Sequence, residues 1–271
     1  MLNQPDKLKL VSYLAPNMFW FYSAVGAYLS SVLKVEIEIV QSQDDPLSDP
    51  LLLQDRLDIA FVCGLPFIRH DRVAPNQLKA IVAPVMQAKR YQNRPVYFSD
   101  IVVNAASRIT TLDNLAGKTW CYNDPGSNSG YNLLLYWLIE SGKPSSFFDK
   151  VIQSGSHQNS IKLVAEGGAD CAAIDSTVLE QELRNLPHLV NDLRVIKSLG
   201  PYFMPPVVVA NHLGAALIDR LQSALLNPDT QLRSLMDEAQ IQRYVTVQSE
   251  DYQAIASIYN IVVQAGYAVL S

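Results

Sequence analysis

Two hydroxyl side chains and one amide stand together between two glycines in the stretch 124–131, DPGSNSGY. The apolar run before it, 117–122, is typical of a strand, and the Leu- and aromatic-rich run after it, 132–140, is typical of a buried helix. Ser127 or Ser129 could cap this helix, because a serine oxygen can accept from the free N–H groups of the first turn. The same N–H groups and the helix dipole form a ready anion site. The stretch therefore predicts either an anion-binding turn or an ordinary capped turn.

Two polar residues further along the chain could contribute to the same site. His157 follows Gly155 and Ser156 at a predicted helix start, a position that favours a ligand donor over the structural or exposed role more common for a single histidine. Asp175 ends a short apolar run, 171–174. It could accept a hydrogen bond from a protonated ligand oxygen, orient His157 or cap the next helix.

Serine, histidine and aspartate also occur together in hydrolases. A hydrolase nucleophile elbow needs the serine at the centre of G-x-S-x-G, and Asn128 holds that centre here. The sequence also has no lysine-containing phosphate loop, no metal-ligand cluster and no HExxH pattern. We therefore expect a protein that binds its ligand without catalysis and uses no cofactor and no metal.

The composition indicates a well-packed globular protein. Its 271 residues suffice for two cores, and 49% of them are hydrophobic while 17% are charged. The net charge of −5 argues against a nucleic-acid partner, which would need a basic face. A small anionic ligand is compatible with that charge, because N–H and O–H donors can bind one without net positive charge. The three cysteines, Cys63, Cys121 and Cys171, lie in or beside apolar runs, which predicts buried free thiols.

The sequence also bears on the location of the protein. No apolar run reaches the roughly 18 residues of a membrane span, so we expect no direct membrane insertion. Residues 1–9 are polar and lack the apolar core of a signal peptide. The protein is therefore expected to be cytosolic or to begin after a removed export signal.

The order of the predicted elements indicates an α/β protein with two lobes. In the first sixty residues strands and helices alternate, which implies a parallel sheet with helices on its faces. Two extended segments, at 97–103 and 199–210, are interpreted as crossings between lobes. If both cross the same boundary, 104–202 form an inserted lobe, and 1–101 with 206–271 form the other, its C-terminal part mostly helical. Lobes joined by two strands form a hinge with a ligand cleft between them.

Three further side chains are candidates for contact with a ligand. Tyr13 and Asn17 flank the end of the first predicted strand, where open α/β sheets bind ligands. Tyr97 stands at the first predicted crossing, and packing in the hinge is its alternative role. The aromatic residues 19–22 have helical spacing and are predicted to belong to the core.

A series of motifs follows in order along the chain. They are DIAF at 58–61 with Gly64, the extended segment 97–103, LDNLAGK at 112–118, DPGSNSGY at 124–131, GSH at 155–157 and GADCAAID at 168–175. In this combination the chain resembles the phosphonate, phosphite and phosphate substrate-binding proteins of ABC importers. The resemblance covers nearly the whole chain and is strongest over 97–176. It implies a type II periplasmic-binding-protein fold with two lobes, two crossing strands and a cleft between the lobes.

The resemblance also implies roles for individual residues. Ser127 and Ser129 match the family's two anion-binding serines, His157 matches its motif histidine, and Asp175 matches its acidic residue at the end of the following strand. The family usually has Thr where this chain has Asn128, and it usually has a Tyr near Phe67. The predicted ligand-binding residues are Ser127, Asn128, Ser129, His157, Asp175, Tyr97, Tyr13 and Asn17.

We therefore predict non-catalytic binding of a small phosphorus oxyanion, which is a phosphonate, phosphite or phosphate. By resemblance, the ligand is delivered to the membrane subunits of an ABC importer, and the protein is periplasmic or extracytoplasmic, with a cytoplasmic location as the alternative. We expect a monomer. A ligand-sensing module of the same fold that binds another small molecule is the competing hypothesis, because fold alone does not decide between delivery and sensing.

Overall fold

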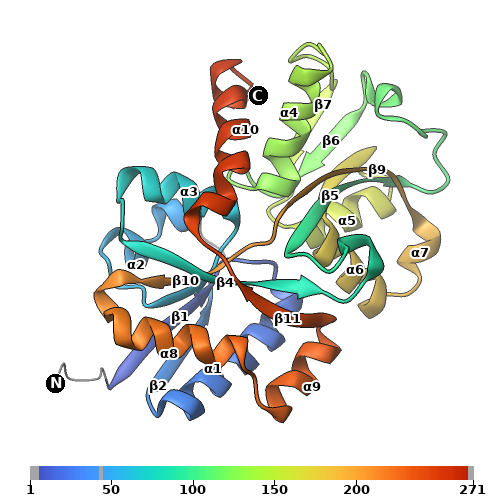
Figure 1. Ribbon diagram of the computed structural model, residues 1–271. Coiled ribbons are helices and arrows are strands. Elements are labelled where there is room, and N and C mark those ends of the chain that lie inside the picture. Colours follow the sequence, from blue (N-terminus) through green and yellow to red (C-terminus); the bar gives the residue numbers. More distant parts are fainter. Residues whose placement is uncertain (1–5, 43–44, 268–271) are drawn as a thin grey trace. The chain divides into compact units, whose positions relative to one another are not determined.

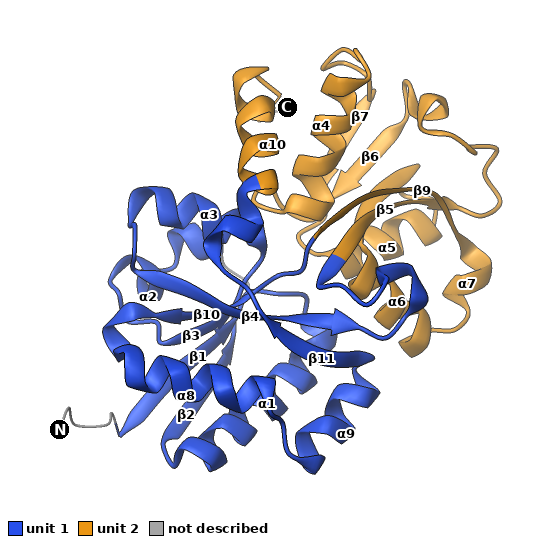
Figure 2. Ribbon diagram, viewed as in Figure 1, with its two compact units in different colours: residues 1–96, 203–253 blue, residues 97–202, 254–271 orange. Residues whose placement is uncertain are grey.

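The computed structural model describes residues 6–42 and 45–267. The chain forms two compact units, each with its own sheet (Figures 1 and 2). Unit 1 comprises Met1–Val96 and Phe203–Gln253, and unit 2 comprises Tyr97–Tyr202 and Ala254–Ser271. The chain therefore passes from one unit to the other at three places, after Val96, Tyr202 and Gln253.

Unit 1 is built on a mixed sheet with the strand order β11-β4-β10-β3-β1-β2. Its strands are β1 (Lys7–Ser12), β2 (Glu36–Gln41), β3 (Ile59–Phe61), β4 (Leu78–Met86), β10 (Val207–Ala210) and β11 (Ile241–Thr246). The early strands β1, β2 and β3 pair in parallel, as the alternation of strands and helices predicts. The late strands β10 and β11 enter antiparallel to their neighbours.

Helices cover both faces of this sheet. They are α1 (Phe19–Leu33), α2 (Pro50–Leu53), α3 (Gly64–Val73), α8 (Ala215–Leu226) and α9 (Thr230–Glu238), with short helices at Pro16–Met18, Pro46–Ser48, Lys89–Tyr91, Asn211–Leu213 and Ser249–Tyr252. On one face α1 packs with α8 and α9, whereas α2 and α3 lie on the other (Figure 1). Gly26 allows α1 to lie close to the sheet, because the Cβ of any other residue at this position would stand 2.6 Å from the Cδ1 atom of Ile39.

Unit 2 has a five-stranded sheet with the order β7-β6-β8-β5-β9. Its strands are β5 (Val96–Asn104), β6 (Thr119–Tyr122), β7 (Lys150–Gln153), β8 (Cys171–Asp175) and β9 (Leu193–Phe203). Its helices are α4 (Leu133–Glu140), α5 (His157–Ala165), α6 (Ser176–Asn185), α7 (Leu189–Asp192) and α10 (Gln253–Gln264), with short helices at Leu112–Leu115 (η4) and Asn128–Asn132 (η5). The central strand β6 is parallel to both neighbours, β7 and β8, and β5 is antiparallel to β8.

Alternation along the strands of unit 2 gives the sheet two cores. Trp120 of β6 packs on the face covered by α4 and α10, and Cys121 packs on the opposite face with α5 and α6. Cys171 of β8 lies in the same cluster as Trp120, so Cys121 and Cys171 point to opposite faces. Both are buried free thiols, as predicted, whereas Cys63 is only partly buried.

The C-terminal segment differs from the predicted arrangement in its last helix. The segment is mostly helical, as expected, with α8 and α9 in unit 1 and a break near Val245. The break is the edge strand β11 of unit 1, and α10 belongs to unit 2 and not to the first lobe as expected. Val262 of α10 is buried in the core around Trp120, and the Tyr267 hydroxyl donates to the Lys143 carbonyl at 2.5 Å. These contacts place 254–267 in unit 2, whereas the predicted lobe boundary assigned this segment to the first lobe.

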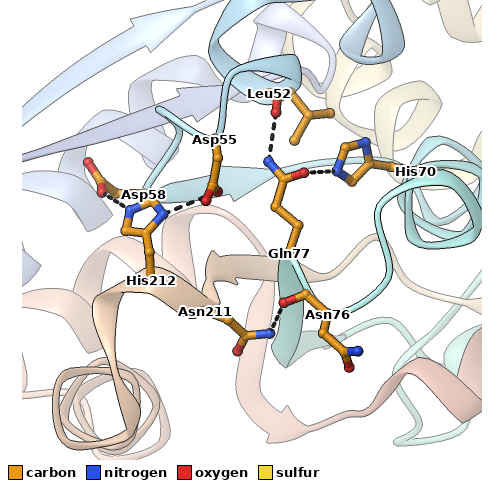
Figure 3. Close-up of polar contacts among 8 residues, drawn as sticks. All are labelled: Leu52, Asp55, Asp58, His70, Asn76, Gln77, Asn211 and His212. Carbon is orange, nitrogen blue, oxygen red and sulfur yellow. Dashed lines mark hydrogen bonds and ion pairs between the residues drawn. The ribbon is translucent and has the colours of Figure 1, made fainter.

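A group of polar contacts in unit 1 joins segments that are far apart in the sequence (Figure 3). His212, just after β10, lies between two carboxylates, with its Nδ1 3.2 Å from Asp55 Oδ1 and its Nε2 2.9 Å from Asp58 Oδ1. Gln77 bridges the Leu52 carbonyl and the His70 ring. Partial burial alone would lower the pKa of His212, but the hydrogen bonds and charges of Asp58 and Asp55 raise it above 6.5.

The His212 contacts predict a pH-dependent contribution to stability. Because the pKa of His212 is raised on folding, its imidazolium stabilises the folded state below the unfolded pKa, and this contribution is lost as the pH rises through the folded pKa. We expect His212→Gln to lower the free energy of unfolding more at about pH 5.5 than at about pH 9. Urea denaturation at both pH values measures the difference. The exposed His188 provides the control His188→Gln, and an equal loss for His212→Gln at both pH values would contradict the prediction.

Candidate functional site

The serine-rich turn follows β6 and leads directly into η5 and α4. Ser127 is the N-cap, and its Oγ accepts from the Gly130 N–H at 3.0 Å. The helix opens with a wide turn, in which the Asn132 N–H donates to the Ser127 carbonyl at 3.1 Å. Of the two cap candidates, the structure therefore selects Ser127, and the helix begins at Asn128. The N–H groups of its first turn lack carbonyl partners within the helix, which suits them to an anion.

Ser129 and His157 form a buried pair beside this helix start. The Ser129 Oγ lies 3.1 Å from the His157 Nε2, and the two residues are 3% and 8% exposed. His157 is the first residue of α5, whose N-cap is Ser156. Burial lowers the pKa of the His157 imidazole to about 4, so the ring is neutral at pH 7.

This pair has one donor to spare whichever ring nitrogen carries the proton. If Nε2 is protonated, it donates to Ser129 and the Ser129 O–H remains available. If Nδ1 is protonated, Ser129 donates to Nε2 and the Nδ1–H remains available. The Nδ1 atom is buried and has no hydrogen-bond partner in the described part of the chain. A buried ring nitrogen without a hydrogen-bond partner costs free energy, which makes the Ser129–His157 pair the candidate contact for a bound group.

Gly130 is required where the turn meets its neighbours. A Cβ atom at Gly130 would stand 1.8 Å from Asn123 Oδ1 and 3.1 Å from the Cε1 atom of His157. Asn123, which the sequence analysis did not single out, donates through Nδ2 to Asp124, and its Oδ1 is buried without a hydrogen-bond partner among the described residues. Its place directly after β6, at the carboxyl end of a strand, is the signal that could have identified it.

Strand β5 holds the turn from the side of the sheet. The Ser99 hydroxyl donates to the Ser129 carbonyl at 2.7 Å. The Asn128 Nδ2 donates to the Tyr97 hydroxyl at 2.6 Å, and the Asn128 Oδ1 accepts from Asn132 at 2.9 Å. Asn128 is fully buried and Tyr97 is 1% exposed. The predicted ligand contacts of Asn128 and Tyr97 stay predictions, and the described partners of the Asn128 amide are protein groups.

Asp175 occupies the position of a helix cap. Its Oδ1 accepts from the Thr177 N–H at 2.8 Å and from the Thr177 hydroxyl at 2.7 Å, which is the capping role left open in the sequence. Burial raises the pKa of the Asp175 carboxyl to about 6, although the hydrogen bonds from Thr177 oppose the shift. Since the His157 Nδ1 has no partner in the described chain, Asp175 does not orient that ring. The geometry of a Ser-His-Asp hydrolase triad is therefore not assembled here.

The remaining two predicted residues belong to unit 1. The Tyr13 hydroxyl donates to Asp49 Oδ2 at 2.7 Å, and Asn17 lies in the short helix after β1. Unit 2 thus contributes six of the eight predicted residues, Ser127, Asn128, Ser129, His157, Asp175 and Tyr97. Within the described residues, no group of three or more His, Cys, Asp and Glu side chains could hold a metal ion.

Comparison with known protein families gives a match over most of the chain. The family model described as "ABC transporter, phosphonate, periplasmic substrate-binding protein" matches residues 12–252. A probable ABC transporter phosphite binding protein, PhnD1 of Prochlorococcus marinus, is 25% identical over 74% of this chain and 70% of its own length. The phosphate-import protein PhnD of Mycolicibacterium smegmatis is 24% identical over 75% of this chain and 64% of its own length.

Solved structures of the same fold cover nearly the whole chain. PhnD1 from P. marinus in complex with methylphosphonate has a TM-score of 0.83 and 21% identity and covers 95% of this chain and 98% of its own. A binding protein component of an ABC phosphonate transporter from Pseudomonas aeruginosa has a TM-score of 0.81 and 17% identity, with 94% and 86% coverage. The predicted type II periplasmic-binding-protein fold is confirmed by this similarity. The described part of the chain contains no helix with the length and apolar character needed to span a membrane.

The capping hydrogen bond of Ser127 predicts a loss of stability in the absence of ligand. Because its Oγ satisfies the Gly130 N–H, Ser127→Ala should lower the free energy of unfolding by about 1 kcal/mol. Ser127→Thr retains a capping hydroxyl and should lose less. Urea denaturation of the ligand-free proteins measures both, and a parent-like Ser127→Ala would show that this hydrogen bond contributes nothing to stability.

Proposed function

Because this chain belongs to the family of periplasmic substrate-binding proteins of phosphonate ABC transporters, we propose that it binds a small phosphorus oxyanion and delivers it to the membrane subunits of an importer. The ligand is a phosphonate, phosphite or phosphate, and it is released unchanged. The proposed location is the periplasm, where the family acts. The observation that carries the proposal is the buried Ser129–His157 pair at a helix start, with one hydrogen-bond donor to spare.

The donors at the turn suit a phosphoryl group. Such a group has three oxygens that need several hydrogen bonds at once. Ser127 can still donate its hydroxyl proton, because its Oγ accepts from Gly130. The Ser129–His157 pair adds one donor, and the first-turn N–H groups of Asn128 and Ser129 add the positive end of the helix dipole.

These donors are all uncharged, which distinguishes the proposed site from one built on arginine or lysine. Ser127 and Ser129 are neutral, and burial keeps His157 neutral at pH 7. Neutral donors inside a protein can hold an anion because the low dielectric strengthens each hydrogen bond. Selection in such a site depends on matching every ligand oxygen with a donor, and we propose this as the basis of ligand recognition.

Asp175 adds a requirement on the protonation of the ligand. Asp175 lies opposite Ser99 in the pairing of β8 with β5. The Ser99 hydroxyl donates to the Ser129 carbonyl, so Asp175 stands on the strand beside the one that holds the serine-rich turn. We propose that Asp175 accepts a hydrogen bond from a protonated ligand oxygen. We further propose that Tyr13 and Asn17 supply contacts from unit 1 to the bound ligand.

Isothermal titration calorimetry with methylphosphonate, phosphite, phosphate and sulfate tests the proposed function. We expect at least one phosphorus oxyanion to bind and to be recovered unchanged. Ser129→Ala and Ser127→Ala should each weaken binding roughly tenfold to a hundredfold, because a buried ligand oxygen loses its donor.

Ser145→Ala is the matched control, because Ser145 is an exposed serine of the same unit. No heat with any phosphorus oxyanion would refute the proposed function. Parent-like binding by Ser127→Ala, Ser129→Ala and His157→Ala together would refute the proposed site.

The neutral state of His157 predicts how the loss of affinity caused by His157→Ala depends on pH. Because its pKa is lowered to about 4, the ring stays neutral between about pH 5.5 and 8, so His157→Ala should weaken binding by the same factor at both pH values. Protonation of the ligand or of Asp175 changes parent and variant alike and cancels in their ratio. Calorimetry at the two pH values measures this ratio of affinities. A larger loss of affinity at the lower pH would identify an imidazolium donor instead.

A further inference from the structure

Asn128 stands at the centre of the serine-rich turn, yet its side chain points into the protein. It is fully buried, and both ends of its amide are engaged by protein groups. The Oδ1 accepts from Asn132 Nδ2 at 2.9 Å, and the Nδ2 donates to the Tyr97 hydroxyl at 2.6 Å. Asn132 lies four residues further along the same helix, a spacing that places the two amides on one face.

The far end of this hydrogen-bond chain is the first residue of unit 2. Tyr97 directly follows Val96, where the chain enters unit 2, and it is one of the largest fully buried side chains. Ser99 is two residues further along β5 and therefore faces the same side of the sheet. It donates to the Ser129 carbonyl at 2.7 Å. Two alternate residues of β5 thus hold two consecutive residues of the turn.

A short, buried hydrogen-bond chain of this kind fixes geometry. In a low-dielectric interior each member polarises the next, and an unpaired member is costly. Removal of the Asn128 amide would leave both the Tyr97 hydroxyl and the Asn132 amide without this partner. The turn could then shift relative to β5, and the hydroxyls of Ser127 and Ser129 would move with it.

We propose that Asn128 is a positioning residue of the anion site, which acts through Tyr97 and makes no side-chain contact with the ligand. This inference rests on the proposed function, and it gives Asn128 a different role from the direct contact expected from its place between the two serines. The link to Tyr97 places the two anion-binding serines at a fixed distance from the strand through which the chain enters unit 2.

A double-mutant cycle on ligand affinity tests the proposal. The variants are Asn128→Leu, Tyr97→Phe and the combination of both, each titrated calorimetrically with the phosphorus oxyanion that the parent binds best. Each single substitution should weaken binding roughly three- to tenfold. The double variant should have about the same affinity as the single variant that binds more weakly, because both substitutions break the same link. Losses that multiply in the double variant would mean independent roles and would overturn the proposal.

Further measurements separate the alternative explanations. Asn128→Thr replaces the amide with a smaller polar group and provides a folded variant if Asn128→Leu fails to fold; it should show the same non-additivity with Tyr97→Phe. Asn191→Leu makes the same exchange at an exposed position of unit 2 and should bind like the parent. If the Asn128 variants melt earlier but retain parental affinity, the role is structural only and the proposal fails. A parent that binds no phosphorus oxyanion overturns the proposed function and this inference with it, whereas multiplying losses overturn this inference alone.

Discussion

An anion that leaves water must regain its hydrogen bonds from the protein, and the site proposed in unit 2 would meet this constraint with neutral donors. The turn after β6 supplies a helix start, a capping serine and a serine–histidine pair within a few residues. These groups can act together only if the backbone is held in place. Gly130 permits the close approach of Asn123 and His157, and β5 fixes the turn through Tyr97 and Ser99. The hydrogen bonds to Tyr97 and Ser99 therefore hold the candidate donors in place.

Burial acts on the two titratable groups near the turn in opposite directions and reduces the charge of both. It lowers the pKa of His157 to about 4 and raises the pKa of Asp175 to about 6. In each case the charged form loses its hydration, and the hydrogen bonds from Thr177 recover part of that loss for the carboxylate. The donors of the proposed site are therefore uncharged at pH 7, whereas the Asp175 carboxyl, with a pKa of about 6, is still mostly ionised at that pH.

Each unit has its own sheet, and the hydrogen bonds of the serine-rich turn to Tyr97, Ser99 and His157 lie within unit 2. The core beneath it contains Trp120 and Tyr131, whose rings stack at a centroid distance of 5.4 Å. Val262 of α10 completes this core from the C-terminal end of the chain. The last helix thus supports the unit that carries the turn, and the two units are joined by three segments of chain instead of the two predicted.

The sequence by itself determined the features that depend on neighbouring residues. The alternation of strands and helices, the capped turn at 124–131 and the motifs spread along the chain were sufficient for the fold class, the family and the position of the turn. Tertiary structure decided the features that depend on partners far away in the chain. Asn128 pairs with Tyr97, 31 residues earlier, and Ser129 pairs with His157, 28 residues later. Long-range contacts likewise produce the burial that makes His157 neutral, the edge strand β11 and the packing of α10 in unit 2. Local periodicity and spacing contain no information about such contacts.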